Sequence, residues 1–219
     1  VSGTLATSRY WRYDRFYYDA AHAKSDTKNF ASGSIKGGLN YNIDRYNNVF
    51  ANVGYISRAP FFSGGVFLMS QSSNAINKDA VNEKAFSFEL GYGLRYKWLY
   101  VALNAYFTKW MDKTTSKSCY MNNNTELYTM SMTGVNAKHM GVELDVVARP
   151  TPYVTLKGML SLGNWRWDNN ATAYFYNSAT QPLANITTGA VASGVGAPDH
   201  LKFTLNQDGI HVGGSAQTT

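Results

Sequence analysis

The sequence is poor in the features that mark several common protein classes. It has one cysteine, Cys119, so no internal disulfide can form and a disulfide-stapled scaffold is excluded. No segment approaches the roughly 18 uninterrupted apolar residues that a transmembrane helix requires. Its 20 Lys and Arg residues outnumber the 14 Asp and Glu residues, but they are spread along the chain. Without a basic cluster, nucleic-acid binding has little support.

Residues that could bind a metal or perform catalysis are also sparse. The four histidines stand far apart, at positions 22, 139, 200 and 211. No spacing of His, Cys, Asp and Glu matches a zinc or iron site, and no nucleophile lies near a base. Histidines in loops can contact a metal chelate, but solvation is the interpretation that we favour. We therefore expect no enzyme, no resident metal and no cofactor.

What the sequence does contain is strict alternation of apolar and polar residues. One set points to one face between residues 35 and 43, comprising Ile35, Gly37, Leu39, Tyr41 and Ile43. The residues between them form the other face, namely Lys36, Gly38, Asn40 and Asn42. A period of two is typical of a β-strand whose faces have different surroundings.

The alternation recurs in about eight segments, which are joined by alternately short and long connections. The predicted strands are residues 3–18, 34–43, 48–59, 84–96, 99–108, 140–148 and 153–165, with an eighth beginning within 201–219. Short turns are expected at 44–47, 97–98 and 149–152, and long loops at 19–33, 60–81, 112–136 and 166–200. This wiring is typical of an antiparallel transmembrane β-barrel, with short periplasmic turns and long extracellular loops. A soluble β-sandwich explains the alternation but not the sorting of loop lengths by end.

The polar positions of the predicted strands would then line the lumen of the barrel. These residues are Lys36, Asn40, Asn52, Arg58, Glu89, Arg95, Asn104, Glu143 and Asp145. Glu143 and Asp145 share a face, which is also the pattern of a carboxylate pair used in catalysis. On a lumen wall, solvated charges or ion pairs with Arg58, Arg95 or Lys157 are the better interpretation.

Aromatic side chains in the long loops are the candidates for binding a ligand. The chain has 16 Tyr, 11 Phe and 5 Trp residues, which also suit the aromatic girdles of a membrane barrel. Aromatic rings stack on sugars, porphyrins and catechols, and arginine pairs with carboxylates and catecholates. For Trp165 the alternative is a place in an interfacial girdle. The predicted ligand-binding residues are Trp165, Arg166, Trp167, Tyr174, Tyr176, Tyr120, Tyr128, Phe61 and Phe62.

Several of these segments carry a family resemblance. In order, they are residues 48–55, 57–62, 82–84, 89–93, 104–107 with Trp110, 141–145, 211–213 and 217–219. In this order and spacing, the stretch from 45 to 167 resembles the barrel domain of TonB-dependent outer-membrane receptors. In such receptors a step like Asn82-Glu83-Lys84 commonly starts the strand after a long external loop.

The resemblance implies a 22-stranded barrel in the bacterial outer membrane, plugged by an N-terminal domain and energised by TonB. About eight strands are recognised here, so we expect residues 1–219 to be part of one β-barrel domain, with the plug domain and the terminal strands outside this sequence. The partners implied are outer-membrane lipid, TonB through the plug domain and a small-molecule ligand. A surface lipoprotein partner is left open, and no nucleic acid is expected.

The function that follows from the resemblance is binding and import of a scarce solute. The solute classes left open are a siderophore or haem iron chelate, a corrinoid and an oligosaccharide. The alternatives are a small eight-stranded outer-membrane barrel with a structural or adhesive role and a soluble β-sandwich binding protein.

Overall fold

The computed structural model describes residues 1–15, 21, 23–68, 74–121 and 126–213. These residues form one antiparallel sheet of nine strands. The strands are β1 Ser2–Tyr10, β2 Lys28–Asn42, β3 Asn47–Arg58, β4 Glu83–Arg95, β5 Leu99–Met121, β6 Glu126–Thr151, β7 Val154–Trp167, β8 Ala171–Tyr176 and β9 Lys202–Leu205. No helix long and apolar enough to cross a membrane occurs in this described part. The predicted all-β antiparallel fold class is confirmed.

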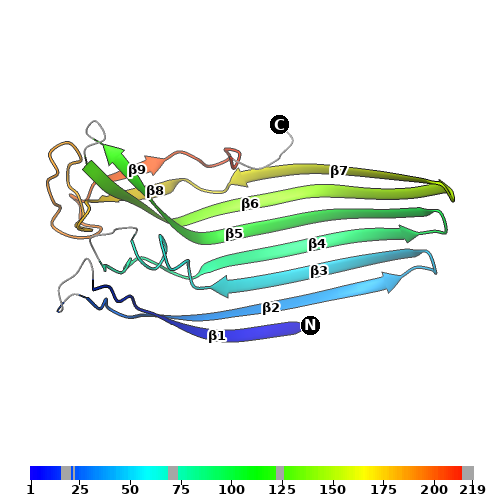
Figure 1. The fold of residues 1–219 in the computed structure, drawn as a ribbon, viewed down its shortest axis with the longest axis horizontal. Coiled ribbons are helices and arrows are strands. Elements are labelled where there is room, and N and C mark those ends of the chain that lie inside the picture. The colour runs from blue at the N-terminus through cyan, green and yellow to red at the C-terminus, as the bar shows by residue number, and fades with distance from the viewer. Residues whose placement is uncertain (16–20, 22, 69–73, 122–125, 214–219) are drawn as a thin grey trace.

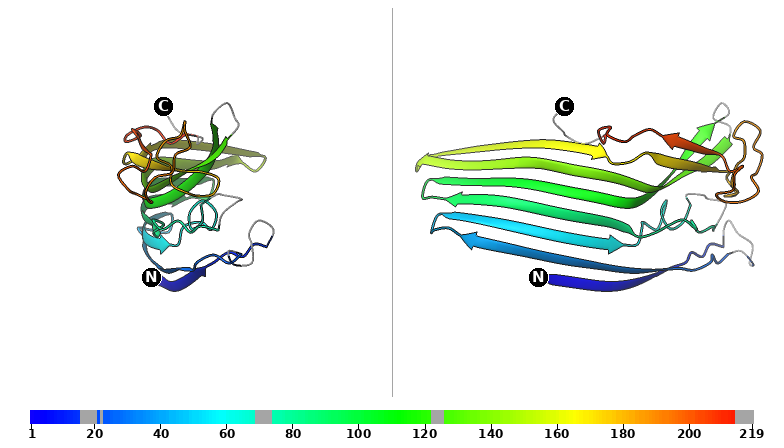
Figure 2. Two further views of the ribbon diagram at one scale, coloured as in Figure 1. Left: turned by 90° about the vertical axis from the view of Figure 1, so that its left-hand side faces the viewer. Right: turned by 180° about the vertical axis from the view of Figure 1, so that it is seen from behind.

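The strands follow one another across the sheet, and the connections are sorted by length. The order is β1-β2-β3-β4-β5-β6-β8-β9. β7 also pairs with β6, along residues 137–151, whereas β8 pairs with residues 129–133 of the same strand. The short turns at 43–46, 96–98 and 152–153 all lie at one end, on the right of Figure 1. Residues 59–68 and 177–201 gather at the opposite end, as Figure 2 shows from behind. The sorting predicted from the sequence is therefore present.

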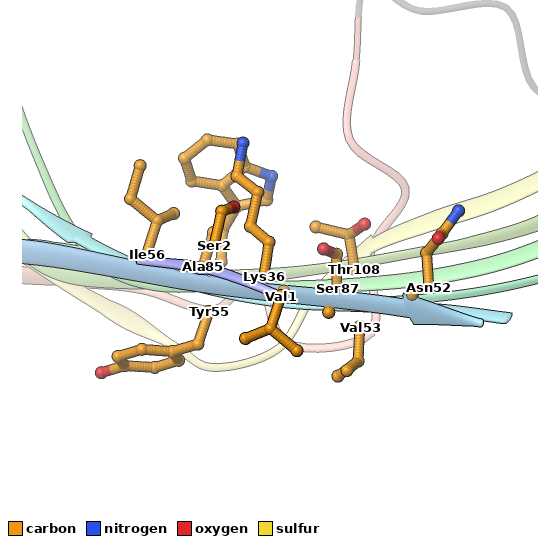
Figure 3. A pocket seen from close by; sticks show the side chains of 14 residues that line it. Val1, Ser2, Lys36, Asn52, Val53, Tyr55, Ile56, Ala85, Ser87 and Thr108 are labelled. Carbon is orange, nitrogen blue, oxygen red and sulfur yellow. The ribbon is translucent and has the colours of Figure 1, made fainter. Parts of the chain in front are cut away.

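The register gives the sheet two different faces. Leu39, Ala51, Leu90, Ala105, Val142 and Leu162 are successive cross-strand partners from β2 to β7. One residue along each strand, the partners are Gly38, Asn52, Glu89, Tyr106, Gly141 and Gly163. We call the face of Leu90 the apolar face and the face of Glu89 the polar face. Figure 3 shows the alternation directly, since Val53 and Tyr55 project from one side and Lys36, Ser87 and Thr108 from the other.

The apolar face is exposed along the whole length of the paired strands. Leu39 is 81% exposed and Leu90 is 51% exposed, although both lie well inside their strands. A soluble protein rarely leaves so extended an apolar surface in water. The described strands do not close into a ring, and β1 and β7 are not paired with each other. The fold is thus an open sheet with the two-faced pattern of a barrel wall.

Two predicted loops are wrong, because strands run through them. The segment 112–136 was expected to be a polar loop, but β5 continues to Met121 and β6 begins at Glu126. Its side chains do not alternate between apolar and polar, yet Thr115–Tyr120 pair with Leu127–Met132 across the hairpin. Likewise the predicted loop 166–200 contains the end of β7 and all of β8, which pairs with residues 129–133 of β6. Backbone pairing, and not an amphipathic pattern, forms these extensions.

The first two strands also differ from the prediction. β1 ends at Tyr10 and not near residue 18, and residues 16–18 lie outside the described residues. β2 begins at Lys28 and not at Ser34, because residues 28–33 pair with Leu5–Tyr10 of β1. The segment 201–219 contributes β9, after which His211 bridges to Arg166 of β7. The segment 217–219 of the resemblance also lies outside the described residues.

A bulge divides the sheet into two parts. The register shifts between Trp110 and Lys113, and Asp112 and Gly134 both have positive φ, at 57° and 70°. Such irregularities bend a strand and change its twist. We call the part on the short-turn side the wall, which is β1–β4, β5 to Trp110, β6 from Ala137 and β7. The cap is the remainder of β5 and β6 with β8, β9 and residues 177–201.

Among the described residues, buried apolar side chains form two small clusters. One lies on the polar face, where Phe30 packs against Val66, Phe67 and Ala80 from the β3–β4 connection. The other lies in the cap and consists of Tyr128, Ala173, Phe175 and Leu183. The described wall has no comparable core between its strands, so its stability comes from the hydrogen-bonded ladder and from the medium that covers its apolar face.

Candidate functional site

The polar face of the wall carries a network of amides and carboxylates. All nine residues predicted to line a lumen lie on this face by register, from Lys36 on β2 to Asp145 on β6. Asn52 Nδ2 donates to Glu89 Oε2 at 3.1 Å, and Asn48 Nδ2 donates to Asn40 Oδ1 at 2.9 Å. Such a surface can hydrogen-bond to water or to a polar solute along its whole length. The complete set is Lys36, Asn40, Asn52, Arg58, Glu89, Arg95, Asn104, Glu143 and Asp145.

At the long-loop end of this face, Arg58 is held in a defined orientation. Its Nη2 donates to Glu83 Oε2 at 3.0 Å, while Cζ lies 4.8 Å from the Phe61 ring centroid and 5.7 Å from that of Trp110. The Glu83 side chain is fully buried and its Oε1 makes no hydrogen bond within the described residues. Arg58 itself is 41% exposed. A guanidinium fixed by a carboxylate and two rings, with one side open, can pair with an anionic group of a ligand.

A second aromatic group lies further along the same face, on β5, β6 and β7. Trp165 Nε1 donates to Tyr106 Oη at 3.0 Å, and the rings of Trp165 and His139 are 5.3 Å apart. Gly141 makes room for this group, because a Cβ there would lie 2.6 Å from Tyr106 Oη. Trp165 therefore belongs to the polar face and not to a girdle on the apolar face. These rings offer stacking surfaces on the polar face, and Trp110 on β5, which contacts Arg58, lies between the two groups.

The predicted aromatics of the β3–β4 connection remain accessible. Phe61 is 60% exposed and Phe62 is 43% exposed, and the Phe62 ring lies 4.8 Å from that of the buried Phe67. The buried Phe67 ring thus packs against Phe62 and holds it in place. Because Phe61 also contacts Arg58, the structure brings one predicted loop aromatic to the polar face of the wall.

The predicted cap aromatics have mostly structural surroundings. His200, which is 2% exposed, lies between Tyr174 and Tyr176, with ring centroids at 4.8 and 5.1 Å. Its Nδ1 accepts from the Gly196 N–H at 2.9 Å, so Nε2 donates to the Phe175 carbonyl oxygen at 3.0 Å. Burial raises the pKa of Tyr176 to about 12, with Asp79 and Tyr174 adding to the effect. Tyr176 is therefore a neutral, packed side chain.

The two other predicted tyrosines differ from each other. Tyr128 is 3% exposed and its hydroxyl donates to the Glu126 carboxylate, so it belongs to the cap core. Tyr120 is 62% exposed on the β5–β6 extension and is free to meet a ligand from solution. Both were predicted to bind a ligand because they are aromatic residues in the same predicted loop, but only Tyr120 is exposed in the structure.

Trp165, Arg166 and Trp167 do not converge on one site. They are consecutive in β7, so the two tryptophans lie on the polar face and Arg166 lies on the apolar face. Arg166 Nε donates to Asn164 Oδ1 at 2.8 Å and Nη1 donates to the Gly209 carbonyl oxygen at 2.6 Å. On the polar face, the arginine that contacts a tryptophan is Arg58, which lies against Trp110 and was predicted only as a lumen residue.

A hollow of about 640 Å³ lies at the edge of the sheet, where β1 begins opposite Lys36 of β2. It is lined by Lys36 and Trp110 from the polar face but also by Val53 and Tyr55 from the apolar face. A space bordered by both faces wraps around a sheet edge and is not a binding pocket. It borders residues 37–42 of β2, which pair with β3 but with no strand on their other side among the described residues.

The described residues contain no cluster of three or more His, Cys, Asp or Glu side chains that could hold a metal ion. The candidate site residues that sequence reasoning missed are Glu83, Trp110, Tyr106 and His139. Glu83 stood in the quoted Asn82-Glu83-Lys84 step, but only the register shows that it lies directly opposite Arg58.

Comparison with known proteins identifies the family. The sequence model described as TonB dependent receptor-like, beta-barrel matches residues 5–204. No curated protein and no solved structure gives a significant match. The matched region includes every strand of the wall apart from the first three residues of β1, and it agrees with the two-faced sheet and its sorted connections. The chain therefore belongs to the TonB-dependent receptor-like β-barrel family, whose members are outer-membrane transporters.

Proposed function

We propose that residues 1–219 form a sector of the barrel of a TonB-dependent outer-membrane transporter that binds and imports a scarce solute. The observation that carries the proposal is the register, which aligns apolar residues on one face and polar residues on the other across β2–β7. Lipid would cover the apolar face, and the polar face would line the passage.

Further strands would complete the barrel. A sheet with two open edges is not tolerated in lipid, because unpaired N–H and C=O groups there cost several kcal/mol each. We infer that the native protein closes these edges with strands outside this sector and is plugged by a domain that TonB engages. An intact mass several-fold above 24.3 kDa for the native protein extracted from membranes is the expected result. A mass close to 24.3 kDa would favour the small structural or adhesive barrel.

The solute would be bound at the long-loop end of the polar face. Arg58 supplies a positive charge with fixed orientation, while Phe61, Trp110 and Trp165 supply rings for stacking. This combination suits an anionic solute with a flat or ring-shaped part. Iron chelates of the siderophore or haem type fit that description best, and corrinoids and oligosaccharides remain the other candidate classes.

Uptake assays test this proposal. A strain lacking the complete receptor would be supplied with wild-type or Arg58→Gln receptor and offered radiolabelled ferric siderophores, haem, a corrinoid or maltooligosaccharides. We expect the wild type to restore TonB-dependent uptake of one solute and Arg58→Gln to reduce that uptake about tenfold, the order expected for a lost charged contact. Lys157→Gln is the matched control, since Lys157 lies on the same face near the short turns. Absence of any receptor-dependent uptake would refute the proposal.

A further inference from the structure

Three cations stand side by side on the apolar face, just beyond its last apolar row on β5 and β6. Lys109 of β5 lies opposite Lys138 of β6, and Lys138 lies opposite Arg166 of β7. The next row toward the short turns contains Phe107 and Met140. The three cations, which we call the cation row, thus follow immediately where the apolar surface ends.

The position of the cation row matches the boundary between hydrocarbon and headgroups. The apolar stretch of β5, counted from Leu99 to Phe107 with the residues between, is nine residues long. A transmembrane β-strand, which is tilted in the membrane, crosses the hydrocarbon in about 9–11 residues. If the apolar face contacts lipid, as proposed above, the cation row lies among the headgroups of the leaflet on the long-loop side.

The cation row carries more positive than negative charge. Asp168 accepts from both lysines, with its Oδ2 2.7 Å from Lys109 Nζ and its Oδ1 3.0 Å from Lys138 Nζ. The hydrogen bonds from these lysines hold the pKa of the Asp168 carboxyl below its usual value. Arg166 donates only to uncharged oxygens of Asn164 and Gly209 in the described structure. The cation row therefore holds three positive charges and one carboxylate, which pairs with the two lysines and not with Arg166.

Repulsion between the three cations destabilises this part of the sheet unless a further anion lies near them. Like charges directly opposite each other in a sheet destabilise it, and here two such pairs are adjacent. The neighbouring pair of Lys84 Nζ and Asp112 Oδ2, 2.6 Å apart, is already neutral and adds no net charge. An anionic group placed against the cation row would offset the repulsion between its members.

We propose that the cation row binds the phosphate group of an anionic lipid in the outer leaflet. This inference rests on the proposed function, which makes the apolar face the lipid-contacting one. Lysine and arginine near a membrane surface attract anionic headgroups and form charge-assisted hydrogen bonds with phosphate oxygens. The acyl chains of such a lipid would lie along Phe107, Met140 and the apolar rows below them. An imported solute would meet the opposite face.

Native mass spectrometry of the complete receptor tests the site. The receptor, in an uncharged detergent, would be titrated with phosphatidic acid, and separately with phosphatidylcholine as a lipid without net charge. We expect one tightly bound phosphatidic acid, with an affinity reduced more than about tenfold in the triple variant Lys109→Gln, Lys138→Gln, Arg166→Gln. The control variant, Arg45→Gln with Lys97→Gln, removes two cations at the short-turn end. An equal loss in both variants, or no loss in the triple variant, overturns the proposal.

A second variant makes the test independent of damage to folding. Asp168→Asn removes the shared carboxylate, so it is expected to strengthen phosphatidic acid binding about fivefold. Weaker or unchanged binding by this variant would show that the cluster is purely structural and would overturn the site. Inorganic phosphate is added as a competitor, and complete displacement of the lipid at equal concentration would identify a free-phosphate site instead.

The inference and the proposed function fail in different experiments. A receptor that imports its solute but loses no lipid in the triple variant would refute only the lipid site. A receptor that binds phosphatidic acid through the cation row but imports none of the offered solutes would refute only the transport proposal.

Discussion

The wall and the cap use apolar side chains in opposite ways. In the wall, Leu39 and Leu90 point outward at 81% and 51% exposure, whereas in the cap Leu183 and Ala173 are fully buried. The wall is thus suited to an apolar medium and the cap to water. Two strands, β5 and β6, pass through both parts, and the pattern of β6 changes near Gly134. The comparison shows that a single hydrogen-bonded ladder can serve two solvents when the side chains change at a bulge.

The largest effect is expected from opening a cavity in the cap. Leu183 packs against Tyr128, Ala173 and Phe175 in a cluster with few other apolar residues. Leu183→Ala should destabilise the cap by about 4 kcal/mol, and Leu183→Met by less than about 1.5 kcal/mol. Hydrogen exchange of residues 171–205 in the complete receptor measures this local stability. If exchange in the wall rose by the same amount, the cap would not be a separate unit.

The matching experiment in the wall places a charge on the apolar face. Leu103→Arg lies in the middle row of that face, where an arginine facing lipid costs about 2–4 kcal/mol. Asn104→Arg, one residue along on the polar face, should be mild. Equilibrium unfolding of the complete barrel from lipid vesicles gives both values. Equal tolerance of the two variants would contradict the assigned faces.

A smaller effect is expected at the pair that joins the wall to the β3–β4 connection. Arg58→Gln leaves the Glu83 carboxylate buried without its cation. Loss of one partner from a fully buried pair costs about 3–5 kcal/mol, and since Arg58 is 41% exposed we expect about 2 kcal/mol. The double variant Arg58→Gln, Glu83→Gln should recover most of this loss in the same unfolding assay. Additive losses would mean that the two side chains are not coupled.

The smallest effect concerns the short turn between β2 and β3. Asp44 accepts from the Tyr46 and Asn47 N–H groups at 2.7 and 2.8 Å, which lowers the pKa of its carboxyl from 3.8. Its contribution to stability is therefore present above about pH 4 and is lost as the pH falls through the lower native value. The protection factor of the Asn47 amide, which is its intrinsic exchange rate divided by its observed rate at the same pH, should fall in that acid range. In Asp44→Ala this fall should be absent.

The faces of the wall strands were predictable because alternation alone determines them. Leu39, Ala51 and Leu90 fall on the apolar side in sequence, and the register then places them in one row. The extension of β5 and β6 was not predictable in this way. Residues 113–120 are mostly Lys, Thr and Ser, so no apolar period marks them, and their strand structure depends on the partner across the hairpin.

The candidate site was predicted only in part for the same reason. The sequence pattern predicts that the seventh strand ends at Trp165, which makes Arg166 and Trp167 loop residues on a common surface. Extending β7 to Trp167 puts neighbouring residues on opposite faces. The contact between Arg58 and Glu83 joins positions 25 residues apart, and only the pairing of β3 with β4 reveals it. Local sequence fixes the facing of a side chain, whereas its partners depend on the register.

The β5–β6 hairpin has a consequence for the order in which the chain folds. Its strands are adjacent in sequence and pair from Leu99–Ala148 to Met121–Glu126, so closing it requires only a small loss of chain entropy. Both β7 and β8 then find their positions on one preformed template, β6. We expect pulse-labelled amides of β5 and β6 to become protected before those of β1 and β2. Once this hairpin has formed, the position of the cap relative to the wall is determined, before any other strand has paired.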